Sequence, residues 1–313
     1  MKKLYAIVTA VMLLCIFTAC TTTKKETKAT LTKLPERMFW KITGTDANGL
    51  PSTVYIQGTF HLGDDRVYPL ADTVLAAWDE ADRLVGEVSL ADYADLPSEI
   101  ETQVIQSYLN AKKRNILDYL TDRQKETLNA YLSEEMAEQM AAFEPWCLTT
   151  TLTGMLYTES GLSPELGLDS NFIEMAVEEG RDIEGLDEMQ TQLDVLTFGD
   201  YDTQLAMLQG MLDELYDPSE ETQFTNELYE AYLSGDVAKM TMLFEAEEKA
   251  DTETQAFYKD YYTFIFADRN EDWAKDITGY LQQGGTTFVF AGCGHWLGDK
   301  SVFSYLRKMG TLH

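Results

Sequence analysis

The chain has 313 residues, with 53 acidic and 24 basic side chains, so its formal net charge is −29. A chain this acidic, with no cluster of Lys and Arg, lacks the positive surface that grips phosphate, which excludes nucleic acid as a partner. Its length allows one large domain or two small ones, and the acidity itself indicates only a well-solvated surface.

The first residues are typical of an export signal. Two lysines precede an apolar run over residues 4–17, which is short for a membrane span. The run leads into Ala19-Cys20, a junction that resembles bacterial lipoprotein signals, with cleavage before Cys20 and acylation (palmitate) of its thiol. The alternative is an ordinary secretory signal cleaved after Ala19. In both cases residues 1–19 are removed and the protein is exported; in the first case a lipid also anchors it to the cell envelope.

The mature chain is predicted to begin with a tether and continue as a single domain. Residues 20–36 include a polar, Thr- and Lys-rich stretch and form the tether, and residues 37–313 form the domain. Strand-like runs at residues 39–43 and 53–57 flank a hairpin connection at residues 46–49. The domain therefore opens with a β-hairpin.

A third strand is predicted over residues 83–89, after a helix that begins past Pro69. Glu87 lies among the apolar residues of this strand, where a carboxylate is costly to bury without a partner. Glu87 therefore either belongs to a polar site or faces water at a strand edge.

Residues 97–283 are predicted to be mainly helical, with a capping box at residues 121–124 and a short strand at residues 181–186. The chain returns to a strongly apolar strand at residues 286–291 and closes with a helix over residues 300–309. The sequence thus predicts an α/β (α+β) fold, in which a mixed central sheet is built from both ends of the chain around a long helical insertion.

Two nearly identical segments follow strands near the two ends of the domain. Residues 58–64 read Gly-Thr-Phe-His-Leu-Gly-Asp, and residues 292–299 read Gly-Cys-Gly-His-Trp-Leu-Gly-Asp. They hold two of the three histidines, His61 and His295, and the third, His313, is the last residue. Glycines permit a tight turn after a strand, and loops at the carboxyl ends of strands are where α/β proteins build sites. We expect the two turns to lie on neighbouring strands and to share one site.

Two histidines at one site indicate a metal, because neutral imidazole is the commonest metal ligand in proteins. Glu87 is the acid that fits best as a third ligand or as a general base, and this set leaves positions open for water, as a hydrolytic metal site requires. A structural, hydrogen-bonding role for each histidine is the alternative. If both histidines bind metal as neutral imidazoles, activity falls on acidification through about pH 6.5.

Cysteine chemistry is not expected at this site. After the signal and the lipid attachment, only Cys147 and Cys293 remain. Cys293 lies in the second histidine segment, but its counterpart in the first segment is Thr59, which argues against a required cysteine nucleophile. The sequence leaves open whether the two cysteines pair.

A set of short motifs runs in order through residues 38–310. They are Phe39-Trp40-Lys41, Gly58-Thr59-Phe60-His61-Leu62-Gly63, Tyr68-Pro69-Leu70, Glu87, Pro145-Trp146, Gly167-Leu168-Asp169, Gly185-Leu186 with Gln192, Gly235-Asp236, Arg269-Asn270 with Trp273-Ala274, and Gly292-Cys293-Gly294-His295. Together they resemble the TraB/PrgY/GumN family, whose animal members include the Tiki metalloproteases. Erythromycin-esterase-like and haem-binding ChaN-like proteins are related to this family.

The resemblance implies a metal-dependent peptidase. Family members carry two Gly-x-x-His motifs and a glutamate, which match His61, His295 and Glu87. Related esterase-like enzymes place an arginine in the site, and Arg269 fits that role, in which it stabilises negative charge on the carbonyl oxygen. The candidate supporting residues are Asp64, Asn270 and Asp169.

The chain departs from the family pattern at three places. Asp187 stands where the family often has a glutamate after leucine, and Trp296 follows the second histidine as an extra bulky residue. The chain also ends soon after Gly310, where relatives usually continue into a last strand. These departures bear on the substrate pocket and the sheet edge more than on the two histidines.

We therefore expect an exported, lipid-anchored, metal-dependent hydrolase whose substrate is a peptide or protein. Manganese, cobalt and zinc are all compatible with nitrogen and oxygen ligands. The alternative function is that of a lipoprotein of the same fold that binds a peptide, haem or metal without turnover.

Overall fold

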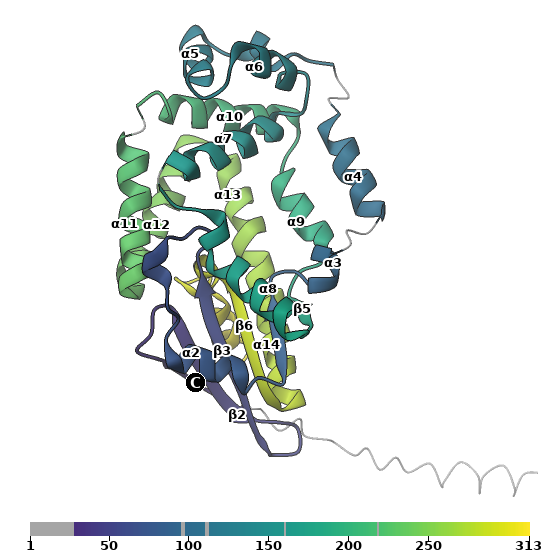
Figure 1. Ribbon diagram of the computed structural model, residues 1–313, viewed down its shortest axis with the longest axis vertical. Helices are drawn as coiled ribbons and strands as arrows, with labels where there is room; N and C mark the ends of the chain where they lie inside the picture. Colours follow the sequence, from purple (N-terminus) through teal and green to yellow (C-terminus); the bar gives the residue numbers. More distant parts are fainter. Residues whose placement is uncertain (1–27, 95–97, 110–112, 160, 218) are drawn as a thin grey trace, which may run out of the picture.

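Figure 1 shows the computed structural model, which describes residues 28–94, 98–109, 113–159, 161–217 and 219–313. One six-stranded sheet has the strand order β1-β2-β3-β6-β4-β5. Its strands are β1 (Thr30–Lys33), β2 (Phe39–Thr45), β3 (Pro51–Thr59), β4 (Arg83–Gly86), β5 (Ile183–Gly185) and β6 (Gly285–Gly292).

Helices surround the sheet and fill the long segment between β4 and β6. In chain order they are η1 (Asp65–Val67), α2 (Asp72–Asp79), α3 (Leu90–Ala94), α4 (Ser98–Tyr108), η2 (Ile116–Tyr119), α5 (Asp122–Tyr131), α6 (Glu134–Met140), α7 (Pro145–Glu159), η3 (Pro164–Leu166), α8 (Leu168–Glu179), α9 (Met189–Leu196), α10 (Tyr201–Glu214), α11 (Ser219–Ser234), α12 (Val237–Thr254), α13 (Phe257–Tyr262), the π-helix η4 (Thr263–Asp268), α14 (Arg269–Gln283), η5 (Cys293–Trp296) and α15 (Val302–Lys308).

The sheet is mixed and joins the two ends of the chain. The pairs β1–β2 and β2–β3 are antiparallel, whereas β3–β6, β6–β4 and β4–β5 are parallel. The central pair, β3 with β6, runs from Ser52 opposite Gly285 to Thr59 opposite Gly292. The predicted fold class, a mixed sheet built from both ends of the chain with a long helical insertion, is confirmed.

Part of the segment predicted to be a tether belongs to the sheet. Residues Thr30–Lys33 form β1, which is hydrogen-bonded to β2. Ala29 forms an isolated parallel bridge with Leu312, so the last residues of the chain also meet this edge. A tether over all of residues 20–36 is therefore wrong, because the segment joins the fold from Ala29 onward.

Successive side chains of β6 point to opposite faces of the sheet, and helices cover both faces. Phe288 and Phe290 point to one face, where Trp78 of α2 and Phe172 of α8 cover them. The ring centroids of Phe172 and Phe288 are 5.2 Å apart, and both side chains are fully buried. Helix α14 packs against β2 and β3 on the other face, as Figure 1 shows. A strand buried on both faces explains the nearly continuous apolar run in the sequence.

The helical insertion has a hydrophobic core of its own. Side chains from η2, α5, α6, α7 and α10 form it, among them the fully buried Leu128, Leu148 and Leu208. The predicted capping box at the start of α5 is confirmed, with Thr121 and Gln124 each bonding the backbone of the other. In Figure 1 these helices lie beyond the end of the sheet opposite the β2–β3 hairpin. The insertion therefore stands over the edge at which β3 and β6 end.

Strand β4 is shorter than predicted and ends at Gly86, so Glu87 follows the strand instead of lying in its middle. Gly86 pairs with Gly185 of β5. Two further backbone bonds, from Leu186 to Gly86 and from Asp187 to Glu87, hold the following residues side by side. Two acidic side chains thus emerge together at the carboxyl end of the sheet.

Within the described residues, no helix combines the length and apolar character needed to cross a bilayer. The predicted signal over residues 1–19 and the lipid attachment at Cys20 fall outside those residues. Both stay predictions.

Phe172 provides a test of the packing on the β6 face. Replacing it with alanine empties a site between α8 and the sheet, so Phe172→Ala is expected to destabilise the fold by about 3–5 kcal/mol. Val177→Ala on the same helix is the control, because Val177 is 59% exposed. Urea unfolding measures both variants, and an unchanged midpoint for Phe172→Ala would contradict this packing.

Candidate active site

The register of β3 and β6 brings the two histidine segments to one edge of the sheet. Thr59 pairs with Gly292, the last residue of β6. His61 follows two residues after β3, and His295 lies in η5 directly after β6. The two turns are on neighbouring strands, as the sequence predicted.

The turn that carries His61 is locked against the segment before α8. The backbone of Gly63 exchanges hydrogen bonds with Ser163 at 2.8 and 2.9 Å. A Cβ on Gly63 would lie 1.9 Å from the carbonyl oxygen of Leu166, and a Cβ on Gly167 would lie 2.2 Å from that of His61. Glycine is required at both positions because the two backbones touch. This contact delivers Asp169, at the start of α8, to His61.

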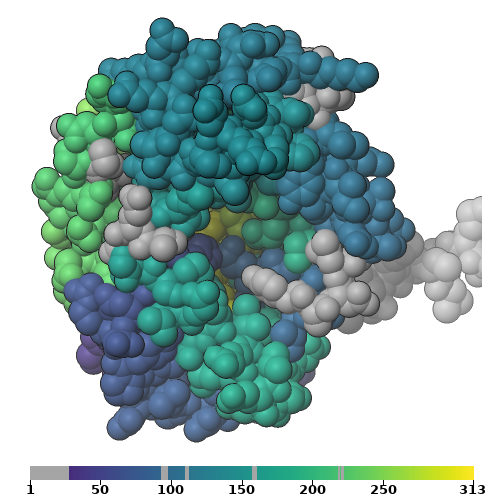
Figure 2. Space-filling view, turned by 45° about the horizontal axis from the view of Figure 1, so that its top comes forward, coloured from purple at the N-terminus to yellow at the C-terminus, as the bar shows by residue number. Residues whose placement is uncertain are grey.

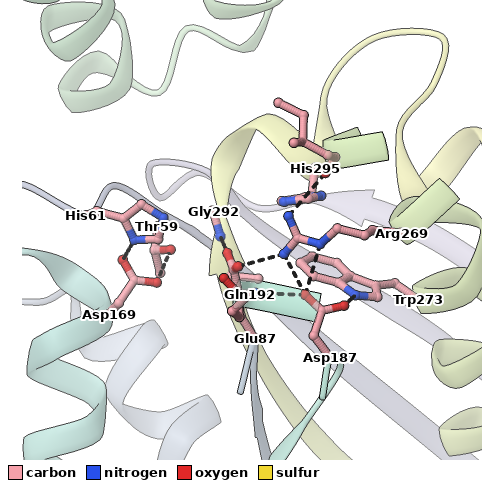
Figure 3. Close-up of polar contacts among 12 residues, drawn as sticks. Thr59, His61, Glu87, Asp169, Asp187, Gln192, Arg269, Trp273, Gly292 and His295 are labelled. Atoms are coloured by element: carbon pink, nitrogen blue, oxygen red, sulfur yellow. Dashed lines mark hydrogen bonds and ion pairs between the residues drawn. The ribbon is translucent and has the colours of Figure 1, made fainter. Parts of the chain in front are cut away.

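Three candidate site residues, His61, Glu87 and His295, converge on Gly292. The position that a Cβ would occupy there lies 3.1 Å from Glu87 Oε1, 3.8 Å from His61 Nε2 and 3.7 Å from His295 Cδ2. Figure 3 shows Gly292 between His61 on one side and His295 with Arg269 on the other. The structure therefore brings together His61, His295 and Glu87, and any side chain at residue 292 would intrude among them.

His61 is oriented by Asp169. Its Nδ1 lies 2.9 Å from Asp169 Oδ2, and Thr59 Oγ1 donates to Oδ1 at 2.5 Å. The negative charge of Asp169 raises the pKa of His61 to about 9. Burial alone would raise the pKa of Asp169, but His61 and the two hydrogen bonds outweigh it and lower that pKa. In the metal-free protein Nδ1–H therefore donates to a carboxylate, and Nε2 faces the convergence point.

His295 is fully enclosed and held in a defined tautomer. Asn270 Nδ2 donates to the carbonyl oxygen of Lys300 at 2.8 Å, so Asn270 Oδ1 faces the imidazole. His295 Nδ1 lies 2.6 Å from that oxygen and must carry the proton, which leaves the Nε2 lone pair free. Phe266 and Trp273 flank the ring. Burial lowers the pKa of His295 to about 3, so it is neutral at physiological pH.

Glu87 is held from two sides. Its Oε1 accepts the Gly292 N–H at 2.8 Å, and its Oε2 accepts from Arg269 Nη2 at 2.9 Å. Burial disfavours the charged carboxylate, but the positive charges of His61 and Arg269 favour it, and the pKa of Glu87 lies below its usual range. Glu87 is therefore an ionised acid with a fixed orientation and does not face water at a strand edge.

Arg269 is a counterion of buried acids more than a group that reaches toward a substrate. Its Nε and Nη2 donate to Asp187 at 2.9 and 2.6 Å, and Nη2 also donates to Glu87. Its Nη1 donates to the carbonyl oxygen of Ile265 at 3.1 Å. Four of the five guanidinium N–H groups are therefore used within the protein. The role expected of Arg269, stabilising an oxyanion, stays a prediction that rests on one remaining N–H.

A cavity of about 500 Å³ opens onto these residues. The turns after β3 and β6, Glu87 and Arg269 line one side, and α9, α11, α12 and η4 supply largely apolar side chains on the other. The space-filling view shows a recess below the insertion, with residues from both ends of the chain, purple and yellow, at its floor (Figure 2). His61 is 69% exposed because it borders this space.

The remaining predicted residues have clear positions. Asn270 and Asp169 contact the two histidines, whereas Asp64 caps η1 and bonds Arg66 and Tyr229 instead. Trp296 is a core residue whose indole bonds the backbone of β6. Both described cysteines, at positions 147 and 293, are buried and unpaired.

Asp187 is the site residue that sequence reasoning missed, since it was noted only as a departure from the family pattern. Its side chain is 6% exposed and binds Arg269. A signal was available: Asp187 directly follows the short strand predicted over residues 181–186, and Glu87 directly follows β4 in the structure. The acids after two neighbouring strands are candidates for one site.

The two histidines have the orientation that a metal site requires, but no third ligand is grouped with them among the described residues. Each imidazole has its Nδ1 engaged by a carboxylate or an amide oxygen, which is how metal-binding histidines are usually oriented. In the described part of the chain, however, no three His, Cys, Asp or Glu side chains are grouped closely enough to hold one ion. The described residues therefore hold no assembled metal site: His61 and His295 are the side chains that would bind an ion, and Glu87 is committed to Gly292 and Arg269.

Comparison with known proteins assigns the chain to a family. A model of the TraB/PrgY/gumN family matches residues 38–312. The chain belongs to the TraB/PrgY/gumN family. Within the range of the match lie both histidine turns, Glu87 and Arg269. An uncharacterized protein of Treponema pallidum (strain Nichols) is 27% identical over 312 residues, which cover 97% of this chain and 92% of that protein. No solved structure matches the chain.

The His61–Asp169 pair predicts a distinctive titration. In the metal-free protein His61 is expected to titrate near pH 9 by NMR, and Asp169→Asn is expected to return its pKa toward 6.5. Because the folded pKa of His61 exceeds the unfolded value, the stability from this pair is complete below about pH 6.5 and is lost as pH rises toward 9. Because the folded pKa of Asp169 is lowered, stability is also lost on acidification below about pH 3.8. Equal pKa values of His61 in both proteins would refute the assignment.

Proposed function

We propose that this protein is a metal-dependent hydrolase that cleaves a peptide bond. The observation that carries the proposal is the convergence of two oriented imidazoles and an ionised carboxylate beside one cavity. His61 and His295 would hold a divalent ion, manganese, cobalt or zinc, through their Nε2 atoms. Such an ion would polarise a carbonyl group and make water more acidic.

Glu87 is assigned the role of proton acceptor rather than metal ligand. Gly292 and Arg269 already bind its two oxygens, which fixes the carboxylate while leaving each oxygen a further lone pair. Arg269 keeps Glu87 ionised by placing a positive charge 2.9 Å from Oε2. A carboxylate with this orientation can take a proton from a water molecule in the cavity.

Loading of a metal requires His61 to lose a proton. Since its pKa is raised to about 9 by Asp169, protons compete with the metal at higher pH than an ordinary histidine would allow. The sequence-based expectation of a decline near pH 6.5 assumed two neutral imidazoles. His295 is neutral at that pH, as assumed, but without metal His61 is protonated.

The alternative is a protein of the same fold that captures a peptide, haem or metal without turnover. The observation that favours it is that Glu87 is bound on both oxygens and that no three-ligand group is assembled among the described residues. Binding without cleavage by a metal-loaded protein would decide for this alternative.

The catalytic assignment is tested with variants of the two histidines. Protein purified without chelator is expected to contain about one divalent ion per chain by elemental analysis and to cleave members of a peptide library. His61→Ala and His295→Ala should each lose both metal and activity, because each removes one of two protein ligands. His313→Ala is the matched control. Full activity of both variants in metal-free buffer would exclude the proposal.

Glu87→Gln separates a base from a ligand. Glutamine keeps the size of the side chain but cannot accept a proton, so the rate should fall by about 10²–10⁴-fold while the metal content is retained. Glu184→Gln, an exposed acid on β5, is the control. A Glu87→Gln protein that has lost its metal would identify Glu87 as a ligand, and one with unchanged turnover would remove it from the mechanism.

We further propose that the protein is exported and anchored to the cell envelope by lipid on Cys20. The support is the signal-like sequence of residues 1–20. Cys20→Ser should abolish incorporation of labelled fatty acid and move the protein out of the membrane fraction or leave it uncleaved, because the lipid supplies the membrane affinity. Wild-type labelling of the variant would show that Cys20 is not acylated.

A further inference from the structure

One buried carboxylate, that of Asp187, accepts hydrogen bonds from three different side chains. Its Oδ2 accepts from Arg269 Nε at 2.9 Å, Arg269 Nη2 at 2.6 Å and Gln192 Nε2 at 2.9 Å. Its Oδ1 accepts from Trp273 Nε1 at 2.8 Å. Each carboxylate oxygen offers about two acceptor positions, so the protein itself saturates Oδ2 and uses one position of Oδ1. The Asp187 side chain is only 6% exposed, which leaves it little access to a substrate or a metal.

The place of Asp187 in the sheet explains why it needs these partners. The backbone N–H of Asp187 donates to the carbonyl oxygen of Glu87 at 2.8 Å, so two acidic residues leave neighbouring strands side by side. Like charges placed opposite each other in a sheet repel, and both side chains are largely buried. The guanidinium of Arg269 donates to both and reduces their repulsion, with one positive charge shared by two carboxylates.

Asp187 thereby fixes the group that orients Glu87. Arg269 Nη2 donates to both acids, at 2.6 Å to Asp187 and at 2.9 Å to Glu87. On its other side Arg269 is held by the carbonyl oxygen of Ile265, in the π-helix η4, at 3.1 Å from Nη1. The guanidinium cannot rotate without breaking bonds on both sides.

Asp187 also fixes the Trp273 indole ring, which packs against the imidazole of His295. Its bond to the Trp273 indole N–H sets the plane of that ring, whose centroid lies 4.1 Å from the centroid of the His295 imidazole at an interplanar angle of 34°. The Arg269 guanidinium lies 4.9 Å from the centre of the same indole ring. Figure 3 shows Asp187 below Arg269 and Trp273, with His295 above them.

We propose that Asp187 is the positioning residue of this site, a single carboxylate that holds Arg269 against Glu87 and Trp273 against His295. Both halves of the site then depend on one side chain that touches neither substrate nor metal. Gln192 of α9 adds a link from the same carboxylate to the helical insertion. The consequence for turnover rests on the proposed function, whereas the consequence for the orientation of His295 does not.

NMR of the metal-free protein tests the positioning without any assay of activity. Asp187→Asn removes the negative charge. It also introduces an amide N–H donor where Gln192, Arg269 and Trp273 already donate four hydrogen bonds, so some of these bonds are lost. The Trp273 Nε1–H signal, assigned with Trp273→Phe, should move upfield, and the ring signals of His295 should shift because the neighbouring indole moves. Glu188→Gln, an exposed acid next in the chain with no capping bond, should leave both sets of signals in place. Unchanged signals in Asp187→Asn would overturn the proposal.

Kinetics test the same role once a cleaved peptide is known. Asp187→Asn should lower kcat by about 10–100-fold, the usual effect of losing a partner behind a metal or its ligands, and should change KM little because the cavity wall is intact. Asp187→Glu keeps the charge and should recover much of kcat. A loss confined to KM, or a loss matched by the fraction of unfolded protein, would assign Asp187 a merely structural part.

Gln192→Ala serves if Asp187→Asn does not fold, because it removes one donor and leaves the charge pair intact. It should shift the Trp273 and His295 signals in the same directions by smaller amounts, and identical spectra would refute the proposal. If the wild-type protein hydrolyses no peptide, the proposed function is wrong. The NMR result still tests whether Asp187 positions Arg269 and Trp273.

Discussion

The parallel pairing of β3 with β6 is the constraint on which the rest of the structure depends. It joins segments more than 200 positions apart in the chain, and the register that sets Thr59 opposite Gly292 places both histidine turns at one edge. Closing so long a loop costs conformational entropy, although the cost grows only slowly with length. The aromatic residues that cover β6 offset this cost, since Phe172, Trp78 and Phe288 are fully buried against each other. The two similar histidine segments of the sequence, residues 58–64 and 292–299, therefore follow the two strands that this pairing brings together.

Charge compensation is the second organising feature, and it is local. Glu87 and Asp187 share Arg269, and Asp169 pairs with His61. A buried pair that loses one partner leaves an uncompensated charge, which costs about 3–5 kcal/mol. These acids therefore stabilise the fold only as a set with their partners. The same arrangement gives the two imidazoles opposite character: the carboxylate beside His61 favours the charged form, and the apolar enclosure of His295 favours the neutral form.

The sequence predicted the architecture well because its signals are periodic and local. Apolar runs marked β2, β3 and β6, and the capping residues Thr121 and Gln124 marked a helix start. The residues predicted for the site lie together in the fold except Asp64: they are His61, His295, Glu87, Arg269, Asp169 and Asn270. The role of Asp187 was not predicted, because the bond that Arg269 donates to it depends on tertiary packing that no local pattern records. The edge strand β1 was missed because its four residues read as polar linker.

The central proposal is that His61 and His295 share one divalent ion, and a crystal structure of the metal-loaded protein with anomalous scattering from that ion tests it most directly. The predicted result is a single peak near Gly292, with both Nε2 atoms at about 2.0–2.2 Å from the ion. A peak bound by one histidine alone, or located away from this cavity, would contradict the claim.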